Sequence, residues 1–162
     1  MTYTIKGFKT FRGMEGEGFN AVLCRDGKKV ALVDDDANGG PLDYHWADWS
    51  APKVEVPTVN WEGKPWVRKC TPEEAEFVKF VRAQPGAEAF EPEDTFVCAL
   101  VDELAAEKKL RRWCKTQTVV RVKGAKPGDY VLYKVPYSPK VAAAIRSRFP
   151  DVEEIVNERF VA

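Results

Sequence analysis

The sequence predicts an α+β protein, and three observations support this class. Short apolar stretches alternate with turn residues through roughly the first sixty positions. Two segments with helical periodicity follow, and the first of them opens with a capping sequence. After these come two more strand-like stretches, a short helix and a final extended segment. This order predicts an N-terminal antiparallel sheet with packed helices, followed by a C-terminal ββαβ element.

The first sixty residues are expected to form an antiparallel meander. Strands are predicted over residues 2–11, 19–25, 29–34, 42–49 and 53–59. Asp26-Gly27 tolerates the positive φ angles of a tight hairpin turn between the second and third strands. The Asn38-Gly39-Gly40 sequence supplies a later turn. Pro57 ends the last strand or places it at a sheet edge, because proline donates no backbone hydrogen bond.

Two helices should follow the meander. Thr71-Pro72-Glu73-Glu74 combines an N-cap, a proline at the first helical position and a glutamate three residues after the cap. Pro85-Gly86 ends this helix. The second helix is predicted over residues 92–114, where apolar side chains recur with a period of about 3.6 residues.

The C-terminal part reads as strand, strand, helix and strand. Residues 118–123 and 130–135 are the two strands, and Ser138-Pro139 opens a short helix that Pro150 terminates. Residues 152–160 fit a strand or a helical turn, and we favour the strand.

The chain of 162 residues fits one domain, or two subdomains over residues 1–60 and 71–162. The linker near residues 60–70 carries Trp61 and Trp66, which indicates packing rather than free movement. No apolar run approaches the roughly 20 residues that span a bilayer, so no membrane partner is expected. The N-terminus lacks the apolar segment of a signal peptide, which predicts a cytoplasmic location.

Positive and negative charges are unevenly distributed, although the formal net charge is zero. Residues 1–106 carry 12 Lys/Arg and 19 Asp/Glu, residues 107–149 carry 12 and 2, and residues 150–162 carry 1 and 4. Two interpretations fit this pattern. The basic part binds an anionic partner, or the oppositely charged parts pair within the fold.

A basic block with an interleaved tryptophan is the main candidate site. It consists of Lys108, Lys109, Arg111, Arg112, Trp113, Lys115, Arg121 and Lys123. Lysine and arginine bind phosphate groups, and tryptophan stacks on a base, so the block predicts binding of a nucleic acid or a nucleotide. The alternative is structural, because cations also stabilise the C-terminus of a helix.

An acidic loop is the second candidate. Asp34, Asp36 and Asn38 have the spacing that opens a calcium loop, but His45 stands at the twelfth position, where a glutamate is required. A hairpin whose aspartates accept hydrogen bonds from the loop itself is the alternative. Magnesium or manganese chemistry on nucleic acid would recruit further carboxylates, such as Glu15 and Glu17. Apart from a divalent cation in this loop, no cofactor is expected.

Catalytic signatures do not emerge from the sequence. His45 is the only histidine, and it forms no Ser-His-Asp order with other residues. The four cysteines have no metal-ligand spacing and read as free thiols in a reducing compartment. These patterns favour a binding protein over an enzyme.

Several segments resemble a group of small phage and prophage proteins. They are FKTFRGMEGEGFNAVL, DGKKVALVDDDANGG followed by YHW, CKTQTVVRVKG, VPYSPKV and IVNERF. The resemblance implies a bacteriophage source, and it carries over no catalytic or binding residue. Small accessory phage proteins often bind host machinery, including defence systems.

We therefore expect a phage accessory protein that binds a host protein stoichiometrically in the bacterial cytoplasm and counters a defence system. Binding of nucleic acid or a nucleotide through residues 108–123 is the first alternative. A metal-dependent nuclease that uses Asp34 and Asp36 is the second.

Overall fold

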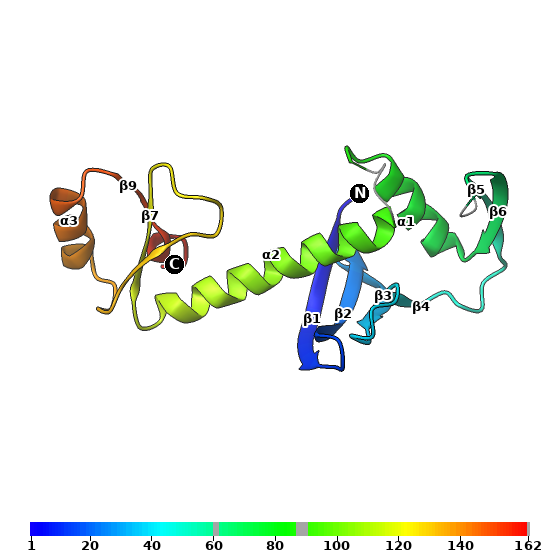
Figure 1. The fold of residues 1–162 in the computed structure, drawn as a ribbon, viewed down its shortest axis with the longest axis horizontal. Helices are drawn as coiled ribbons and strands as arrows, with labels where there is room; N and C mark the ends of the chain where they lie inside the picture. Colours follow the sequence, from blue (N-terminus) through cyan, green and yellow to red (C-terminus); the bar gives the residue numbers. More distant parts are fainter. Residues whose placement is uncertain (60–61, 87–90, 162) are drawn as a thin grey trace. The chain divides into compact units, whose positions relative to one another are not determined.

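A computed structural model describes residues 1–59, 62–86 and 91–161, and it has the predicted α+β architecture (Figure 1). The chain divides into two compact units, Met1–Val101 and Asp102–Ala162. Helix α2 (Pro92–Cys114) contributes residues to both units, with Val97 and Val101 buried in the first and Leu110 in the second. The two units are described in turn.

The first unit contains the predicted antiparallel meander. Its strands are β1 (Tyr3–Arg12), β2 (Glu17–Arg25), β3 (Lys28–Asp35) and β4 (Asp43–Trp46), paired in that order. Asp26 and Gly27 adopt φ angles of 48° and 83°, as the hairpin turn between β2 and β3 requires. The fourth strand is shorter than the predicted 42–49, because the chain turns after Trp46 and leaves Trp49 74% exposed.

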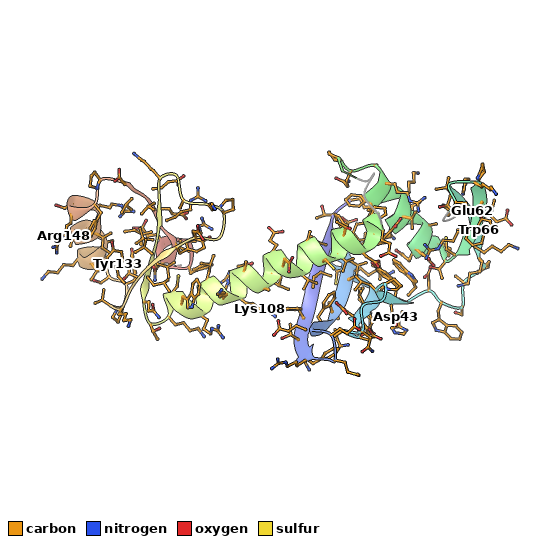
Figure 2. The ribbon with its side chains drawn as sticks, viewed as in Figure 1. Asp43, Glu62, Trp66, Lys108, Tyr133 and Arg148 are labelled. Atoms are coloured by element: carbon orange, nitrogen blue, oxygen red, sulfur yellow. The ribbon has the colours of Figure 1, made fainter. Side chains whose placement is uncertain are left out.

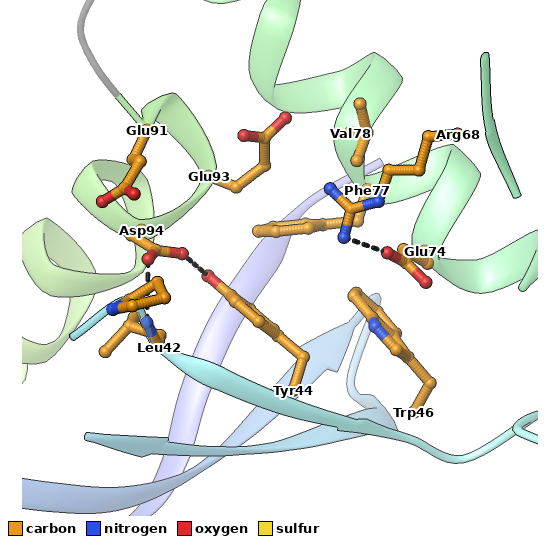
Figure 3. Close-up of a pocket in the computed structure, with 11 residues that line it drawn as sticks. Leu42, Tyr44, Trp46, Arg68, Glu74, Phe77, Val78, Glu91, Glu93 and Asp94 are labelled. Carbon is orange, nitrogen blue, oxygen red and sulfur yellow. Dashed lines mark hydrogen bonds and ion pairs between the residues drawn. The ribbon is translucent and has the colours of Figure 1, made fainter. Parts of the chain in front are cut away.

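An aromatic core joins this sheet to the helices of the same unit. Phe77 of α1 (Pro72–Arg82) is 1% exposed and lies at its centre. Ring centroids of Tyr3, Trp46, Tyr44 and Phe96 lie 5.0, 5.7, 6.0 and 6.0 Å from that of Phe77. Asp94 of α2 accepts hydrogen bonds from the Tyr44 hydroxyl and the Leu42 N–H, both at 2.8 Å, and so ties β4 to α2 (Figure 3).

The predicted cap of α1 is present and is supplemented from the sheet. Thr71 Oγ1 accepts a hydrogen bond from the Glu74 N–H at 3.1 Å. Asp48 Oδ2 accepts from the neighbouring Glu73 N–H at 3.0 Å. Two N–H groups of the first turn, which lack partners within the helix, are thereby satisfied.

Two expectations about residues 53–70 are wrong. β5 (Val54–Val59) does not extend the meander, and much of the expected linker is a strand, β6 (Pro65–Cys70). The two pair as a separate two-stranded antiparallel sheet, with Pro57 opposite Val67. A strand that contains proline suits an edge, and the short connection makes pairing with the next strand entropically cheap. Trp66 of β6 is 59% exposed (Figure 2), whereas Trp61 lies outside the described residues.

The second unit contains the predicted ββαβ element. β7 (Thr118–Val122), β8 (Val131–Tyr133), α3 (Pro139–Arg148) and β9 (Val152–Ile155) follow α2, and the sheet order is β8-β7-β9. Ser138 caps α3 by accepting a hydrogen bond from the Val141 N–H at 3.2 Å. The final strand is shorter than the predicted 152–160, because a 3₁₀ helix, η1 (Val156–Arg159), replaces its second half.

Asn157 explains why the chain leaves the strand conformation at this point. It is 2% exposed. Its Oδ1 accepts a hydrogen bond from the Val119 N–H at 2.8 Å, and its Nδ2 donates to the Cys114 and Gln117 carbonyls at 3.1 and 2.8 Å. The 3₁₀ turn therefore places one amide where it both caps the end of α2 and continues the hydrogen bonding of β7.

Tyr3 provides a test of how the first unit responds to alkaline pH. Burial raises the pKa of Tyr3 to about 12, partly opposed by the nearby Arg25 guanidinium. The folded protein thus prefers the neutral phenol. The buried neutral phenol of Tyr3 contributes fully to stability below the ordinary tyrosine pKa of about 10, and this contribution is lost as pH rises through 12. We expect the free energy of unfolding, measured in urea, to fall less between pH 7 and pH 11 for Tyr3→Phe than for the parent protein.

The same substitution should be nearly neutral at pH 7. The Tyr3 hydroxyl is buried and has no hydrogen-bond partner among the described residues, so removing it breaks no bond in that part of the chain. An equal loss of stability at pH 11 in both proteins would contradict the role given to Tyr3.

Across the described residues, no helix is long and apolar enough to cross a membrane.

Candidate anion-binding site in the second unit

The last turns of α2 carry most of the predicted basic block, and internal contacts engage part of it. Arg111 forms an ion pair with Glu107 at 2.7 Å, and its guanidinium lies over the Phe160 ring at 4.5 Å. The Lys109 ammonium lies 4.8 Å from the centroid of the Trp113 ring. Trp113 is half-buried and packs against the core cluster that contains Leu110. Its role is therefore partly structural.

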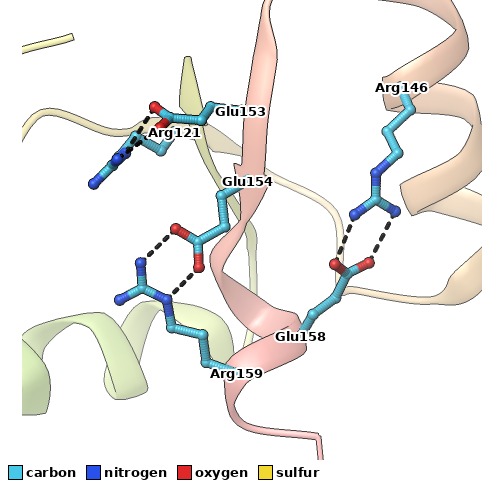
Figure 4. A network of polar contacts seen from close by, with 6 residues as sticks. All are labelled: Arg121, Arg146, Glu153, Glu154, Glu158 and Arg159. Carbon is cyan, nitrogen blue, oxygen red and sulfur yellow. Dashed lines mark hydrogen bonds and ion pairs between the residues drawn. The ribbon is translucent and has the colours of Figure 1, made fainter. Parts of the chain in front are cut away.

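Acidic side chains near the C-terminus engage the arginines of β7, α3 and η1. Figure 4 shows three two-pronged ion pairs, Arg121–Glu153, Arg146–Glu158 and Arg159–Glu154. Hydrogen bonds from Arg121 lower the pKa of Glu153 and raise the pKa of Arg121 itself. Because these pairs are largely exposed and screened by solvent, they contribute little to stability. Their main effect is to pair three arginines with three glutamates, so that other cations dominate the surface.

Simple alternation would place Arg121 and Lys123 on one face of a single strand, but only Arg121 lies within β7. The pairing of β7 with β9 shifts register between Arg121 and Val122, and β7 ends at Val122. Lys123 lies just beyond the strand, where its N–H donates to the Asp151 carbonyl at 2.9 Å. An irregularity of this kind reorients the side chains that follow it.

Three residues of the basic block keep exposed charges. Arg112, Lys115 and Lys123 make no side-chain ion pair within the described part of the chain, and all three are exposed. The second unit as a whole carries 13 Lys/Arg and 8 Asp/Glu, and the first unit 12 and 17. The second unit is therefore basic by five charges, and the first is acidic by five.

One of these cations, Lys115, lines a pocket of about 370 Å³. It is lined by Arg111, Cys114, Lys115, Pro136, Tyr137, Asn157, Phe160 and Val161. Arg111 of α2 and Lys115, which directly follows the helix, thus lie next to Tyr137 and Phe160, two aromatic residues that the sequence did not single out. Nothing in their spacing along the chain indicates this grouping, since it depends on how η1 and the segment after β8 return to α2.

Only some of the residues that line this pocket have groups free to contact a ligand. Asn157 already uses both of its side-chain polar atoms within the fold. Burial raises the pKa of the Cys114 thiol, with a smaller opposing effect from Arg159, so this thiol stays protonated and unreactive at neutral pH. Lys115, Arg111 and the aromatic side chains remain as the groups that would contact a ligand. Positive charge beside aromatic surface suits a phosphate attached to a planar group.

In the acidic loop, aspartates accept hydrogen bonds from the loop itself, which was the alternative to a metal site. Asp36 accepts hydrogen bonds from the Asn38 N–H at 2.9 Å and the Asn38 side-chain amide at 3.1 Å. Asp34 instead accepts from Asn20 of the neighbouring strand and lies 3.1 Å from His45 Nε2. A divalent ion would have to displace the Asn38 amide, and Asp34 and Asp36 engage different partners.

Glu15 comes close to this loop, as the nuclease alternative requires. Its N–H donates to the Ala37 carbonyl at 3.0 Å, and its carboxylate lies beside Gly39. Within the described ranges, however, no three histidine, cysteine or acidic side chains group closely enough to hold a metal ion. A divalent cofactor in this loop stays a prediction.

Comparisons with known proteins give no relative for this chain. Neither protein families, nor curated proteins, nor solved structures contain a match.

Proposed function

We propose that this protein acts by stoichiometric binding, and that its second unit binds an anionic ligand of the nucleotide or nucleic acid class. The observation that carries this proposal is the pocket in which Arg111 and Lys115 lie beside Tyr137 and Phe160. Arg112 and Lys123 add further exposed positive charge to the same unit. The volume of the pocket lies within the range of known ligand pockets.

Charge reversal of the exposed cations tests this proposal. We expect Arg112→Glu combined with Lys115→Glu to weaken binding of a fluorescent single-stranded oligonucleotide, measured by anisotropy. Loss of two phosphate contacts should also reduce the slope of log K against log salt by about 1.4, since each contact with a single strand contributes about 0.7. Arg111 is left intact because of its contacts with Glu107 and Phe160.

The matched control reverses two lysines of the first unit. Lys28→Glu with Lys29→Glu makes the same change of net charge at the exposed start of β3. If both double variants weaken binding equally, the oligonucleotide responds only to overall charge, and the site proposal is wrong. A nucleotide titrated by calorimetry, in place of the oligonucleotide, separates a small ligand from a strand.

We further propose, as a second candidate, that the protein is a phage accessory protein that binds a host protein in the bacterial cytoplasm and so counters a defence system. The supporting observation is a set of exposed apolar side chains on the β5–β6 sheet, Val59, Trp66 and Val67, with exposed fractions of 62, 59 and 46%. The strand register places Val59 and Val67 on one face of this sheet and Trp66 on the other. Large exposed apolar side chains, tryptophan above all, favour protein contacts. The opposite charges of the two units would help to orient a charged partner.

Capture from host lysate distinguishes the two candidates. A protein partner that persists after nuclease treatment and is lost in Trp66→Ala supports the host-protein proposal. Trp49→Ala is the control, because Trp49 is at least as accessible, at 74% exposure against 59% for Trp66, but lies outside the β5–β6 sheet. Loss of every partner on nuclease treatment supports the nucleic acid proposal instead. Incubation of nucleic acid with Mg²⁺ or Mn²⁺ tests the nuclease alternative, in which Asp34 and Asp36 would be required.

A further inference from the structure

A second pocket lies within the first unit and has the opposite electrostatic character. Its volume is about 280 Å³, and it is bounded by β4, β6, α1 and the start of α2 (Figure 3). All of its lining residues lie between Pro41 and Asp94, so it is independent of the anion-binding pocket.

One wall of this pocket is aromatic. Tyr44 and Trp46 are two residues apart on β4, and alternation places both on the same face. Their rings are stacked, with centroids 5.7 Å apart and planes inclined by 7°. Phe77 lies beside them. The faces of such rings attract organic cations.

Carboxylates form the facing wall and the rim. Asp94 is held by the Tyr44 hydroxyl and the Leu42 N–H. Burial, followed by the nearby Asp94 charge, raises the pKa of Tyr44, so the phenol stays a neutral hydrogen-bond donor. Glu93 forms an ion pair with Arg82 at 3.0 Å. Glu91 lies on the rim and has no side-chain partner among the described residues.

The chain's own Arg68 shows which kind of group this environment accepts. Its guanidinium lies near Phe77 and Trp46 and pairs with Glu74, which is only 9% exposed (Figure 3). A planar cation is therefore already accommodated at one side of the pocket, and the side formed by Glu91, Glu93 and Asp94 remains open to another.

The charge balance favours a cation even though the pocket lies at the start of α2. A helix N-terminus contributes about half a positive charge, which by itself favours anions. Four lining carboxylates, Glu74, Glu91, Glu93 and Asp94, oppose it. After subtraction of the Arg68 and Arg82 charges and the helix dipole, a negative balance of about one and a half charges remains.

We propose that this pocket binds a guanidinium group, supplied by a free guanidino compound or by an arginine side chain of a partner polypeptide. The group would lie over the Tyr44 ring and donate to the carboxylates at the start of α2. This proposal is independent of the anionic ligand proposed for the second unit.

Calorimetry with matched small ligands tests the proposal on the full chain. N-acetyl-arginine methylamide should bind, and its neutral isostere, N-acetyl-citrulline methylamide, should bind about tenfold more weakly or not at all, since only the charge differs. A glycine-flanked arginine pentapeptide that binds more tightly than the amide would identify a polypeptide as the source, and equal affinity would identify a free compound. Equal binding of the arginine and citrulline ligands, or no binding of either, overturns the proposal.

Substitutions then locate the site. Glu91→Gln with Glu93→Gln should weaken arginine binding by about tenfold, because two charges at the open side are removed. Glu76→Gln, on the exposed surface of α1, is the control and should change nothing. Arg68→Gln should instead strengthen binding, since it removes a competing cation and releases Glu74. Unchanged affinity in both the Glu91/Glu93 and the Arg68 variants would place the ligand elsewhere and disprove the site.

Discussion

Phe77→Ala is expected to destabilise the first unit by about 3–5 kcal/mol, the largest effect of any single substitution considered for it. Phe77 is almost completely buried, and the rings of Tyr3, Tyr44, Trp46 and Phe96 surround it. Replacement by alanine removes its dispersion contacts and leaves a cavity that aromatic neighbours cannot readily fill. The measurement is urea unfolding followed by tryptophan fluorescence and circular dichroism.

An aromatic residue at the edge of the same unit provides the comparison. Phe11 is 39% exposed, and Phe11→Ala should cost far less than Phe77→Ala. Equal costs would show that the ring cluster around Phe77 is not the centre of the core. Since Phe77 also lines the pocket proposed to bind a guanidinium group, its substitution should weaken arginine binding as well.

Asn157→Ala should produce the largest loss of stability in the second unit, about 3 kcal/mol. The substitution leaves the buried Val119 N–H without its acceptor, and the Cys114 and Gln117 carbonyls without their donor. Each unsatisfied buried backbone group costs about 1–3 kcal/mol, although the costs are not additive. Unfolding in urea, followed by circular dichroism, measures the change.

Asn157→Asp tests the hydrogen bonds of Asn157 separately from the size of its side chain. Aspartate has nearly the same size, but its carboxylate would face two carbonyl oxygens to which asparagine donates, so it should be at least as destabilising as alanine. Ser147→Ala on the exposed side of α3 is the control for a polar deletion in the same unit. Stability of Asn157→Asp close to that of the parent protein would show that the Nδ2 hydrogen bonds contribute little.

The sequence shows where cations are in excess, and the tertiary structure decides which of them form ion pairs. The excess of lysine and arginine in residues 107–149 is visible in the sequence, and it makes the second unit basic. Internal ion pairs engage part of that excess, and binding of an anion by the rest stays a proposal. Arg111 and Arg121 pair with Glu107 and Glu153, whereas Arg112, Lys115 and Lys123 keep exposed charges. The Glu107–Arg111 pair follows from helical spacing, but the Arg121–Glu153 pair joins residues 32 positions apart, which periodicity does not encode.

Local signals in the sequence determined the α+β class, the meander and the helix starts. Asp26-Gly27, Thr71 and Ser138 act through atoms within three residues of themselves, so their turn and caps can be predicted from the chain alone. Only the tertiary structure decided that β5 pairs with β6, because the apolar pattern of a strand does not specify which other strand it pairs with. It likewise decided that Asn157 turns inward, and that Tyr137 and Phe160 meet the end of α2. Those choices depend on the burial of groups distant in sequence, which exists only once the chain has folded.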